Sequence, residues 1–214
     1  NPLWGHYNPD YCYSGGTSMS TPLVAGAAAL LRQYLTQEWN LDRPSAALMK
    51  ALILQSADDL FPGQYGEGQG QEILRPAPNV HEGYGRVNID RATTPKALDH
   101  YWALIDQTDG VATGEVFSQK IPIANAGPVK VTLVYSDAPG ASMASRALVN
   151  NLDLEVEAPH EPAPRIVSSK SLIDNIEQIK LNDVSVGEIT VRVLGTNVPS
   201  GRNSKHAFAV VVSR

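Results

Sequence analysis

The sequence predicts a mixed fold in which a helical part is followed by an all-β antiparallel part. Residues 18–34 are predicted to form a helix around an apolar segment rich in alanine and leucine, and residues 44–57 show an amphipathic helical pattern. From residue 108 onward, short runs of alternating or β-branched residues are separated by turn residues. Because helical periodicity is almost absent there, we expect one domain at 1–105 and a second, a β-sandwich, at 106–214.

The composition is that of an ordinary globular protein, with 43% hydrophobic and 18% charged residues among 214. The formal net charge is −5 and no run of Lys or Arg occurs, so we expect no nucleic-acid partner. The longest apolar segment, residues 23–31, is shorter than a membrane span, so we expect a soluble protein without a membrane partner. Cys12 is the single cysteine, which excludes a disulfide within the chain.

The glycines at 15 and 16, followed by hydroxyl residues and then the apolar segment, place Ser18 at the N-terminus of the first helix. Free backbone N–H groups and the positive end of the helix dipole stabilise a negative oxygen at such a position. A serine there suits acyl transfer, in which an oxyanion forms beside the nucleophile. The alternative is that Ser18 only caps the helix.

The first helix is apolar on every face up to residue 31, so we expect it to be buried on all sides. The second helix is expected to lie over it. The remaining helical part is predicted to contain a surface loop at 58–80, a short helix at 89–97 and a connection at 98–108.

Five strands are predicted from alternating or β-branched sequence, at 120–123, 129–135, 152–156, 189–193 and 207–212.

The sequence Gly-Thr-Ser-Met-Ser-Thr-Pro at 16–22, followed by Val-Ala-Gly at 24–26, resembles the segment around the nucleophilic serine of the subtilisin-like serine proteases, or subtilases. Gly-Tyr-Gly-Arg-Val-Asn at 83–88 resembles the turn that follows the next helix in that family. The resemblance implies a secreted serine endopeptidase that acts on proteins or peptides, with Ser18 as the catalytic nucleophile. It also implies that residues 1–105 are the C-terminal helical part of an α/β catalytic domain.

Residues 134–139, 148–154 and 175–177 resemble the C-terminal jelly-roll domain of alkaline bacterial subtilases, which is similar to the P domain of kexin-like convertases. Such domains often bind structural Ca²⁺, and carboxylate and amide oxygens are the ligands that Ca²⁺ prefers. The resemblance therefore implies five candidate calcium ligands, namely Asp137, Asn151, Asp153, Asn175 and Glu177.

Asn151 and Asp153 lie two residues apart and so point to one face of a strand. Related sequences tend to have an aspartate in place of Asn151, which weakens the site. Solvated loop carboxylates are the alternative, because no short spacing here forms a complete calcium loop.

A subtilase also needs an aspartate, a histidine and an oxyanion-hole asparagine that precede the serine. Only Asp10 and His6 precede Ser18, in the reverse order and too close together in sequence. We therefore expect the aspartate and the histidine on a preceding N-terminal part of the protease, against which the first helix packs. The chain alone is expected to be inactive. The rival hypothesis is a non-catalytic β-sandwich that binds protein or carbohydrate, with a relic protease segment.

Overall fold

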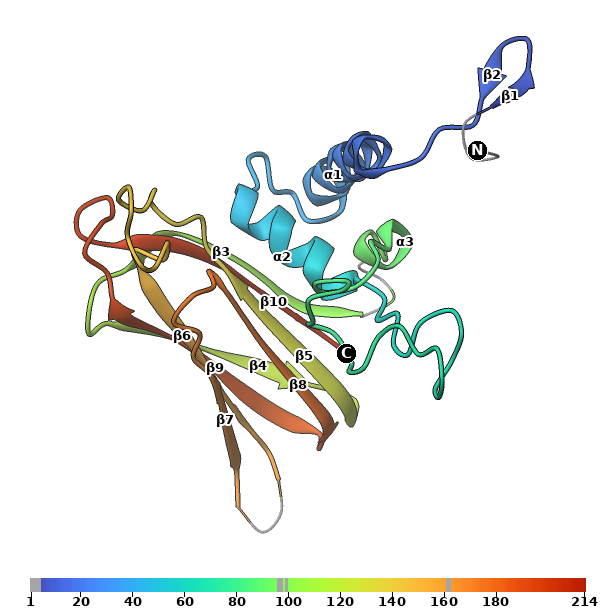
Figure 1. Ribbon diagram of the computed structural model, residues 1–214. Coiled ribbons are helices and arrows are strands. Elements are labelled where there is room, and N and C mark those ends of the chain that lie inside the picture. The colour runs from blue at the N-terminus through green and yellow to red at the C-terminus, as the bar shows by residue number, and fades with distance from the viewer. Residues whose placement is uncertain (1–4, 96–97, 99, 161–162) are drawn as a thin grey trace.

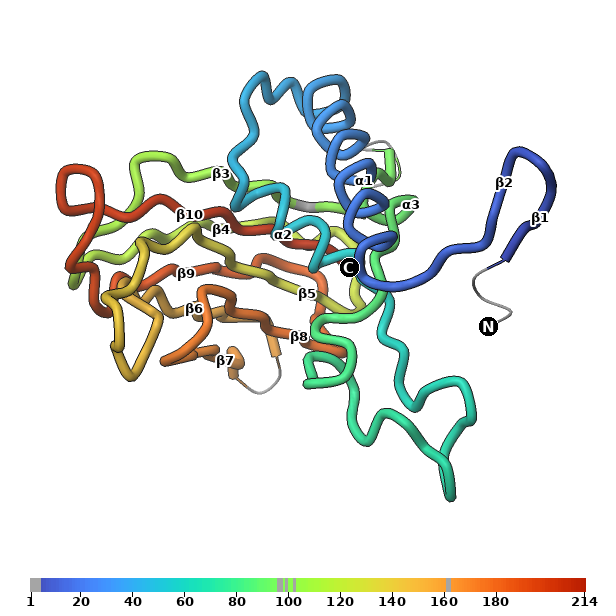
Figure 2. Tube along the Cα trace, turned by 45° about the horizontal axis from the view of Figure 1, so that its top comes forward, coloured from blue at the N-terminus to red at the C-terminus, as the bar shows by residue number. Residues whose placement is uncertain are grey.

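A computed structural model describes residues 5–95, 98, 100–160 and 163–214, in which the helices lie against one face of a β-sandwich (Figure 1). The helices are α1 (Thr17–Glu38), α2 (Ala46–Ser56) and α3 (Ile89–Ala92). A hairpin of β1 (His6–Asn8) and β2 (Tyr11–Cys12) projects away from the helices and the sandwich in both views (Figures 1 and 2). Among these described residues, no helix combines the length and hydrophobicity needed to cross a bilayer.

Helix α1 begins directly after Gly16, whose φ of 125° is a backbone conformation that glycine adopts readily. The helix continues to Glu38, four residues beyond the predicted end at 34. Pro22 lies in its second turn. Because proline has no backbone N–H, the carbonyl of Ser18 lacks the usual donor four residues later in the helix.

Helix α2 starts at a side-chain cap, because the Ser45 hydroxyl oxygen accepts a hydrogen bond of 3.0 Å from the backbone N–H of Leu48. It spans 46–56, close to the predicted 44–57. The short helix predicted at 89–97 is found at 89–92, while residues 96–97 lie outside the described residues.

The second part of the chain is a sandwich of two four-stranded antiparallel sheets, and residues 58–80 form the predicted loop. The first sheet has the order β3-β10-β5-β8 and the second has the order β4-β9-β6-β7. The strands are β3 (Tyr101–Val111), β4 (Val116–Ile123), β5 (Gly127–Val134), β6 (Asn151–Ala158), β7 (Arg165–Ser169), β8 (Ile176–Val184), β9 (Gly187–Asn197) and β10 (His206–Ser213).

All five predicted strands are present, whereas β3, β7 and β8 were not predicted. The expected connection at 98–108 is largely strand β3, which begins at residue 101. The domain boundary expected at residue 105 therefore falls inside this strand.

The sheet that contains β10 is covered on both faces. Phe208, Val210 and Val212 point into the core between the two sheets, whereas Ala209 and Val211 belong to a second core under the helices. This second core also contains Leu48 and Leu52 of α2 and Leu31 and Leu35 of α1. Double coverage explains the continuous apolar run of β10, because a strand buried on both faces has no solvent side.

Candidate active site

Ser18 is the second residue of α1 and its side chain is exposed. The N-cap position is Gly16, and no side chain caps this helix end. Neighbouring hydroxyls bond to the backbone of the preceding turn: Ser20 donates to the carbonyl of Gly16 at 3.3 Å and Thr21 to that of Thr17 at 2.9 Å. The Ser18 hydroxyl makes no hydrogen bond to any described residue, so Ser18 is not used as a helix cap.

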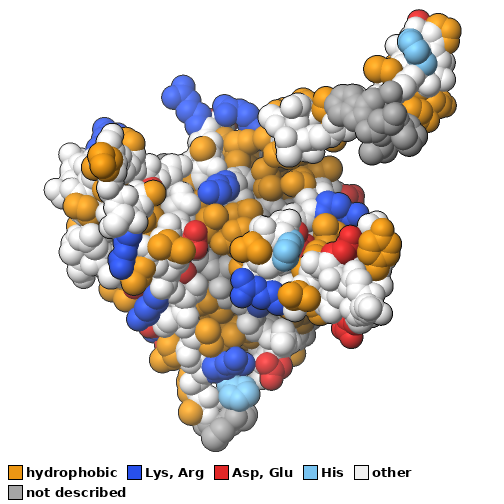
Figure 3. Space-filling model, in the orientation of Figure 1, with side chains coloured by type: hydrophobic (Ala, Val, Ile, Leu, Met, Phe, Trp, Pro, Cys, Tyr) orange, Lys and Arg blue, Asp and Glu red, His pale blue; other side chains and the backbone are white. Residues whose placement is uncertain are grey.

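Helix α1 exposes large apolar side chains, which differs from the expectation that this helix is buried on all sides. Leu23 is 75% exposed and Leu30 is 56% exposed, while the buried residues of the helix are Leu31, Tyr34 and Leu35 in its C-terminal half. Figure 3 shows hydrophobic side chains gathered around α1 on this face of the molecule. An apolar helix surface of this kind is typical of an interface.

A groove of about 380 Å³ lies between α1 and the segment that follows the Gly-Tyr-Gly turn. One wall is formed by Leu23, Val24 and Ala27 of α1, and the other by Val87 and Ile89. The turn that resembles a subtilase motif thus lies beside the helix that carries Ser18.

Asp58 fixes this turn to the end of α2. Its carboxylate accepts hydrogen bonds from the side-chain amide of Asn88 at 3.1 and 3.2 Å, and it pairs with Arg86 at 3.3 Å and Arg91 at 3.2 Å. The hydrogen bond from Asn88, with help from the two arginines, holds the pKa of Asp58 below its ordinary value. Gly85 is required here, because a Cβ at this position would lie 2.2 Å from the backbone oxygen of Asp58.

Within the described residues, no carboxylate or imidazole is hydrogen-bonded to Ser18. His6 and Asp10 belong to the β1–β2 hairpin region, which projects away from α1 (Figure 1).

The five candidate calcium ligands are held in different ways. The Asp137 carboxylate accepts four hydrogen bonds. Three come from the backbone N–H groups of Ala138, Val149 and Asn150, at 2.8, 2.6 and 3.0 Å, and the fourth comes from the Asn150 side chain at 2.9 Å. The Asn175 amide donates to the carbonyl of Tyr135 at 2.6 Å. These two residues fix loops at the end of β5.

Glu177 is buried between the edge strands of the two sheets. It accepts hydrogen bonds from the Ser169 hydroxyl and, at 2.6 Å, from the backbone N–H of Ser171. Burial raises the pKa of this carboxyl, although both hydrogen bonds oppose the rise.

Asn151 and Asp153 differ from the other three candidates, because each has a buried side-chain oxygen without a partner among the described residues. Asn151 is 8% exposed and Asp153 is 5% exposed. The other carboxylate oxygen of Asp153 accepts from the Thr196 hydroxyl at 2.6 Å. No group of three His, Cys, Asp or Glu side chains in the described part of the chain is arranged to hold a metal ion. The pair on β6 is thus the part of the predicted site with free ligand oxygens.

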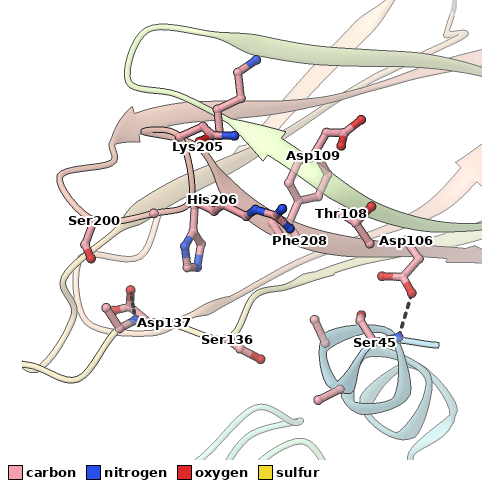
Figure 4. A pocket seen from close by; sticks show the side chains of 17 residues that line it. Ser45, Asp106, Thr108, Asp109, Ser136, Asp137, Ser200, Lys205, His206 and Phe208 are labelled. Atoms are coloured by element: carbon pink, nitrogen blue, oxygen red, sulfur yellow. Dashed lines mark hydrogen bonds between the residues drawn. The ribbon is translucent and has the colours of Figure 1, made fainter. Parts of the chain in front are cut away.

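A pocket of about 850 Å³, which the sequence did not reveal, opens between the start of α2 and the sandwich (Figure 4). Asp106 of β3 accepts a hydrogen bond of 2.8 Å from the backbone N–H of Ser45, and His206 points toward the side occupied by Ser136 and Asp137 (Figure 4). The Nε2 atom of His206 is buried without a partner among the described residues, and burial lowers the pKa of this imidazole.

A buried polar network between α2 and the sandwich was also missed. Gln55 donates to the backbone oxygen of Lys130 and to the Ser213 hydroxyl, both at 2.8 Å, and accepts from the Thr132 hydroxyl. The Lys130 ammonium donates in return to the backbone oxygens of Leu54 and Gln55. The only sequence signal for this network is a glutamine within the amphipathic helical pattern at 44–57.

Comparison with known proteins places this geometry in context. Residues 4–85 match the family model described as Peptidase_S8, the subtilase family. The serine protease/ABC transporter B family protein tagA of Dictyostelium discoideum is 24% identical over 210 residues, covering 86% of this chain and 11% of the relative. The related tagB protein is 25% identical over 243 residues, covering 87% of this chain and 13% of the relative. The chain thus spans only a small part of these relatives.

Solved structures resemble the chain only weakly. A protein of Sulfurospirillum deleyianum matches 52% of this chain and 98% of its own, at 8% identity and a TM-score of 0.34. The pre-peptidase C-terminal domain of collagenase from Bacillus anthracis matches 49% of this chain and 92% of its own, at 6% identity and a TM-score of 0.28. Likenesses of this size support no assignment. The family match rests on the sequence instead: residues 4–85 match the subtilase model, and this match confirms the subtilase recognition made from the motif around Ser18.

Proposed function

We propose that this chain is the C-terminal part of a subtilisin-like serine endopeptidase in which Ser18 is the nucleophile. The observation that carries the proposal is the position of Ser18, whose exposed and unpaired hydroxyl lies in the first turn of an apolar helix. The family match over residues 4–85 supports it. In the proposal, backbone N–H groups at this helix end stabilise the oxyanion.

In the proposed reaction, the Ser18 oxygen attacks the carbonyl carbon of a peptide bond while a histidine takes its proton. The C–N bond then breaks as the histidine returns that proton to the leaving amine, and water hydrolyses the acyl-enzyme ester. The histidine and its aspartate are proposed to lie on a preceding part of the protease. This part is also the proposed occupant of the apolar surface of α1, on which Leu23 is 75% exposed.

The sandwich is proposed to be a jelly roll that stabilises the catalytic domain. The support is the strand order, in which each sheet alternates strands from the two halves of the sandwich sequence, as in a pair of Greek keys. We further propose a secreted protein, as the family resemblance implies, and a structural calcium ion at Asn151 and Asp153. The free buried oxygens of those two side chains fit a hard cation, which would neutralise and coordinate them.

Fluorophosphonate labelling of the full-length protein tests the nucleophile. We expect one labelled serine per protein, loss of the label in Ser18→Ala, and retention of the label in the matched control Ser20→Ala. The 214-residue chain alone is expected to stay unlabelled and to hydrolyse no peptide. A folded full-length protein that takes no label would exclude the protease and favour a non-catalytic binding module.

A further inference from the structure

A second pocket, of about 370 Å³, lies where the C-terminal end of α2 meets strands β5, β8 and β10. Its walls come from both parts of the chain, because Gln55 and Arg91 precede the sandwich whereas the other lining residues belong to it or lead into it. The described lining contains no Asp or Glu. It does contain four basic side chains and one imidazole: Arg91, His100, Lys130, Lys180 and Arg214.

Most of this positive charge forms no ion pair among the described residues, although the charge of Asp59 acts on Lys130. Arg91 pairs with Asp58 at 3.2 Å. Lys130 donates only to backbone oxygens, those of Leu54 at 3.1 Å and Gln55 at 2.8 Å, and the ammonium of Lys180 donates to the backbone oxygen of Ala77 at 3.0 Å. An ammonium has three N–H donors, so both lysines keep donors for a further acceptor.

These charges are close enough to act on one another. Besides burial, the charges of Lys180 and Arg91 lower the pKa of Lys130. Besides burial, the charges of Arg91 and Arg214 lower the pKa of His100. Like charges around a partly enclosed cavity repel one another. An anion in the cavity would attract each of them and so offset this repulsion.

We propose that this pocket binds a small oxyanion, phosphate or carboxylate, that bridges Arg91 of the helical part to Lys130 and Lys180 of the sandwich. A tetrahedral or planar oxyanion has several acceptor oxygens and so satisfies donors from different strands at once. Because both parts of the chain contribute donors, the bound anion holds them together and stabilises the folded protein. The site is remote in sequence from Ser18, and the proposal does not depend on proteolytic activity.

The test is thermal unfolding and equilibrium dialysis of the full-length protein with inorganic phosphate or succinate, at constant ionic strength set with NaCl. At saturating anion we expect Tm to rise by about 4 °C. Lys180→Gln and Arg214→Gln are expected to weaken binding by about fivefold each, since each removes one charged donor. Both side chains are exposed, so both variants are expected to fold.

Lys120→Gln is the matched control, because Lys120 is an exposed lysine of the other sheet that pairs with Glu188 at 2.8 Å. Its anion affinity is expected to equal that of the wild type. Binding of succinate without phosphate identifies a carboxylate as the ligand, and the reverse identifies a phosphate; either result supports the site. The proposal is overturned if neither anion raises Tm beyond NaCl, or if Lys120→Gln weakens binding as much as Lys180→Gln does.

Discussion

The Lys130 ammonium lies 2.8 Å from the backbone oxygen of Gln55, so a residue of the sandwich caps the C-terminal end of α2. The last carbonyl groups at the C-terminal end of a helix lack intrahelical partners. A positive charge there also interacts favourably with the negative end of the helix dipole. The Gln55 side chain makes the reciprocal bond to the backbone oxygen of Lys130 at 2.8 Å. The helices and the sandwich are thus joined by polar bonds as well as by the apolar core beneath α2.

Replacing Gln55 by Leu is expected to destabilise the protein by about 2–3 kcal/mol, because it leaves the Thr132 and Ser213 hydroxyls and a backbone oxygen without their buried partner. Urea unfolding measures the change. Gln37→Leu, at an exposed position of α1, is the control and is expected to change stability by less than about 0.5 kcal/mol. Equal effects of the two substitutions would contradict the role of the buried network.

The pH dependence of stability should report Lys130. Burial, then the neighbouring charges of Lys180 and Arg91, lower its pKa from 10.5 to about 8. Between these values the unfolded chain binds more protons than the folded one, so this lysine makes stability rise as pH increases from about 8 to 10.5. The contribution is at most about 3 kcal/mol, at 1.36 kcal/mol per pKa unit.

Lys130→Met removes the titrating group, so the difference in unfolding free energy between wild type and Lys130→Met should change across this pH range. Urea titrations at pH 7.5 and 10 in phosphate-free buffer measure it. Other groups titrate equally in both proteins and cancel in the difference. A difference that stays constant with pH would show that Lys130 keeps its ordinary pKa.

Leu52→Ala is expected to cost about 2–5 kcal/mol and to loosen the sandwich as well as α2. Leu52 is fully buried, and it shares a core with Ala209 and Val211 of β10. Hydrogen exchange should therefore increase in β10 together with α2. Leu30→Ala removes the same atoms at a 56% exposed position of α1 and should leave exchange in β10 unchanged. Faster exchange confined to α2 would mean that the two parts unfold separately.

The elements that sequence could predict are those whose signal is local. The motif around Ser18 is long enough to be recognised, and strands such as β5 and β6 alternate apolar residues toward one core. Strand β7 was missed because the five residues of this edge strand are mostly exposed and carry little apolar pattern. The continuous apolar run of β10 gave a strand, but it could not tell which element covers the second face.

In the candidate site, too, the sequence could predict only what has a local signal. Asp137 has a carboxylate, which is a suitable cation ligand. Its oxygens, however, accept hydrogen bonds from the backbone N–H groups of Val149 and Asn150, which lie twelve and thirteen positions later in the sequence. Sequence spacing cannot reveal that this loop folds back onto the carboxylate. The network around Gln55 joins residues more than 70 positions apart and likewise leaves no local pattern.

Calcium removal tests the free oxygens of Asn151 and Asp153. If a cation is bound there, a chelator should lower Tm by about 5 °C or more, because a ligand at 100-fold its Kd stabilises the folded state by about 2.7 kcal/mol. Added Ca²⁺ should restore Tm. Asp153→Asn keeps an acceptor for the Thr196 hydroxyl but loses the charge, so it should remove most of the chelator effect.

Asp183→Asn is the control for this experiment, since Asp183 is 71% exposed at its side chain and lies at the far end of β8. Its response to chelator should match the wild type. An unchanged melting curve on chelation, in wild type and both variants, would assign the two unpaired oxygens to buried water. Water satisfies a buried acceptor by hydrogen bonding but leaves the carboxylate charge in place, whereas a cation neutralises it. The size of the chelator effect therefore separates these two occupants.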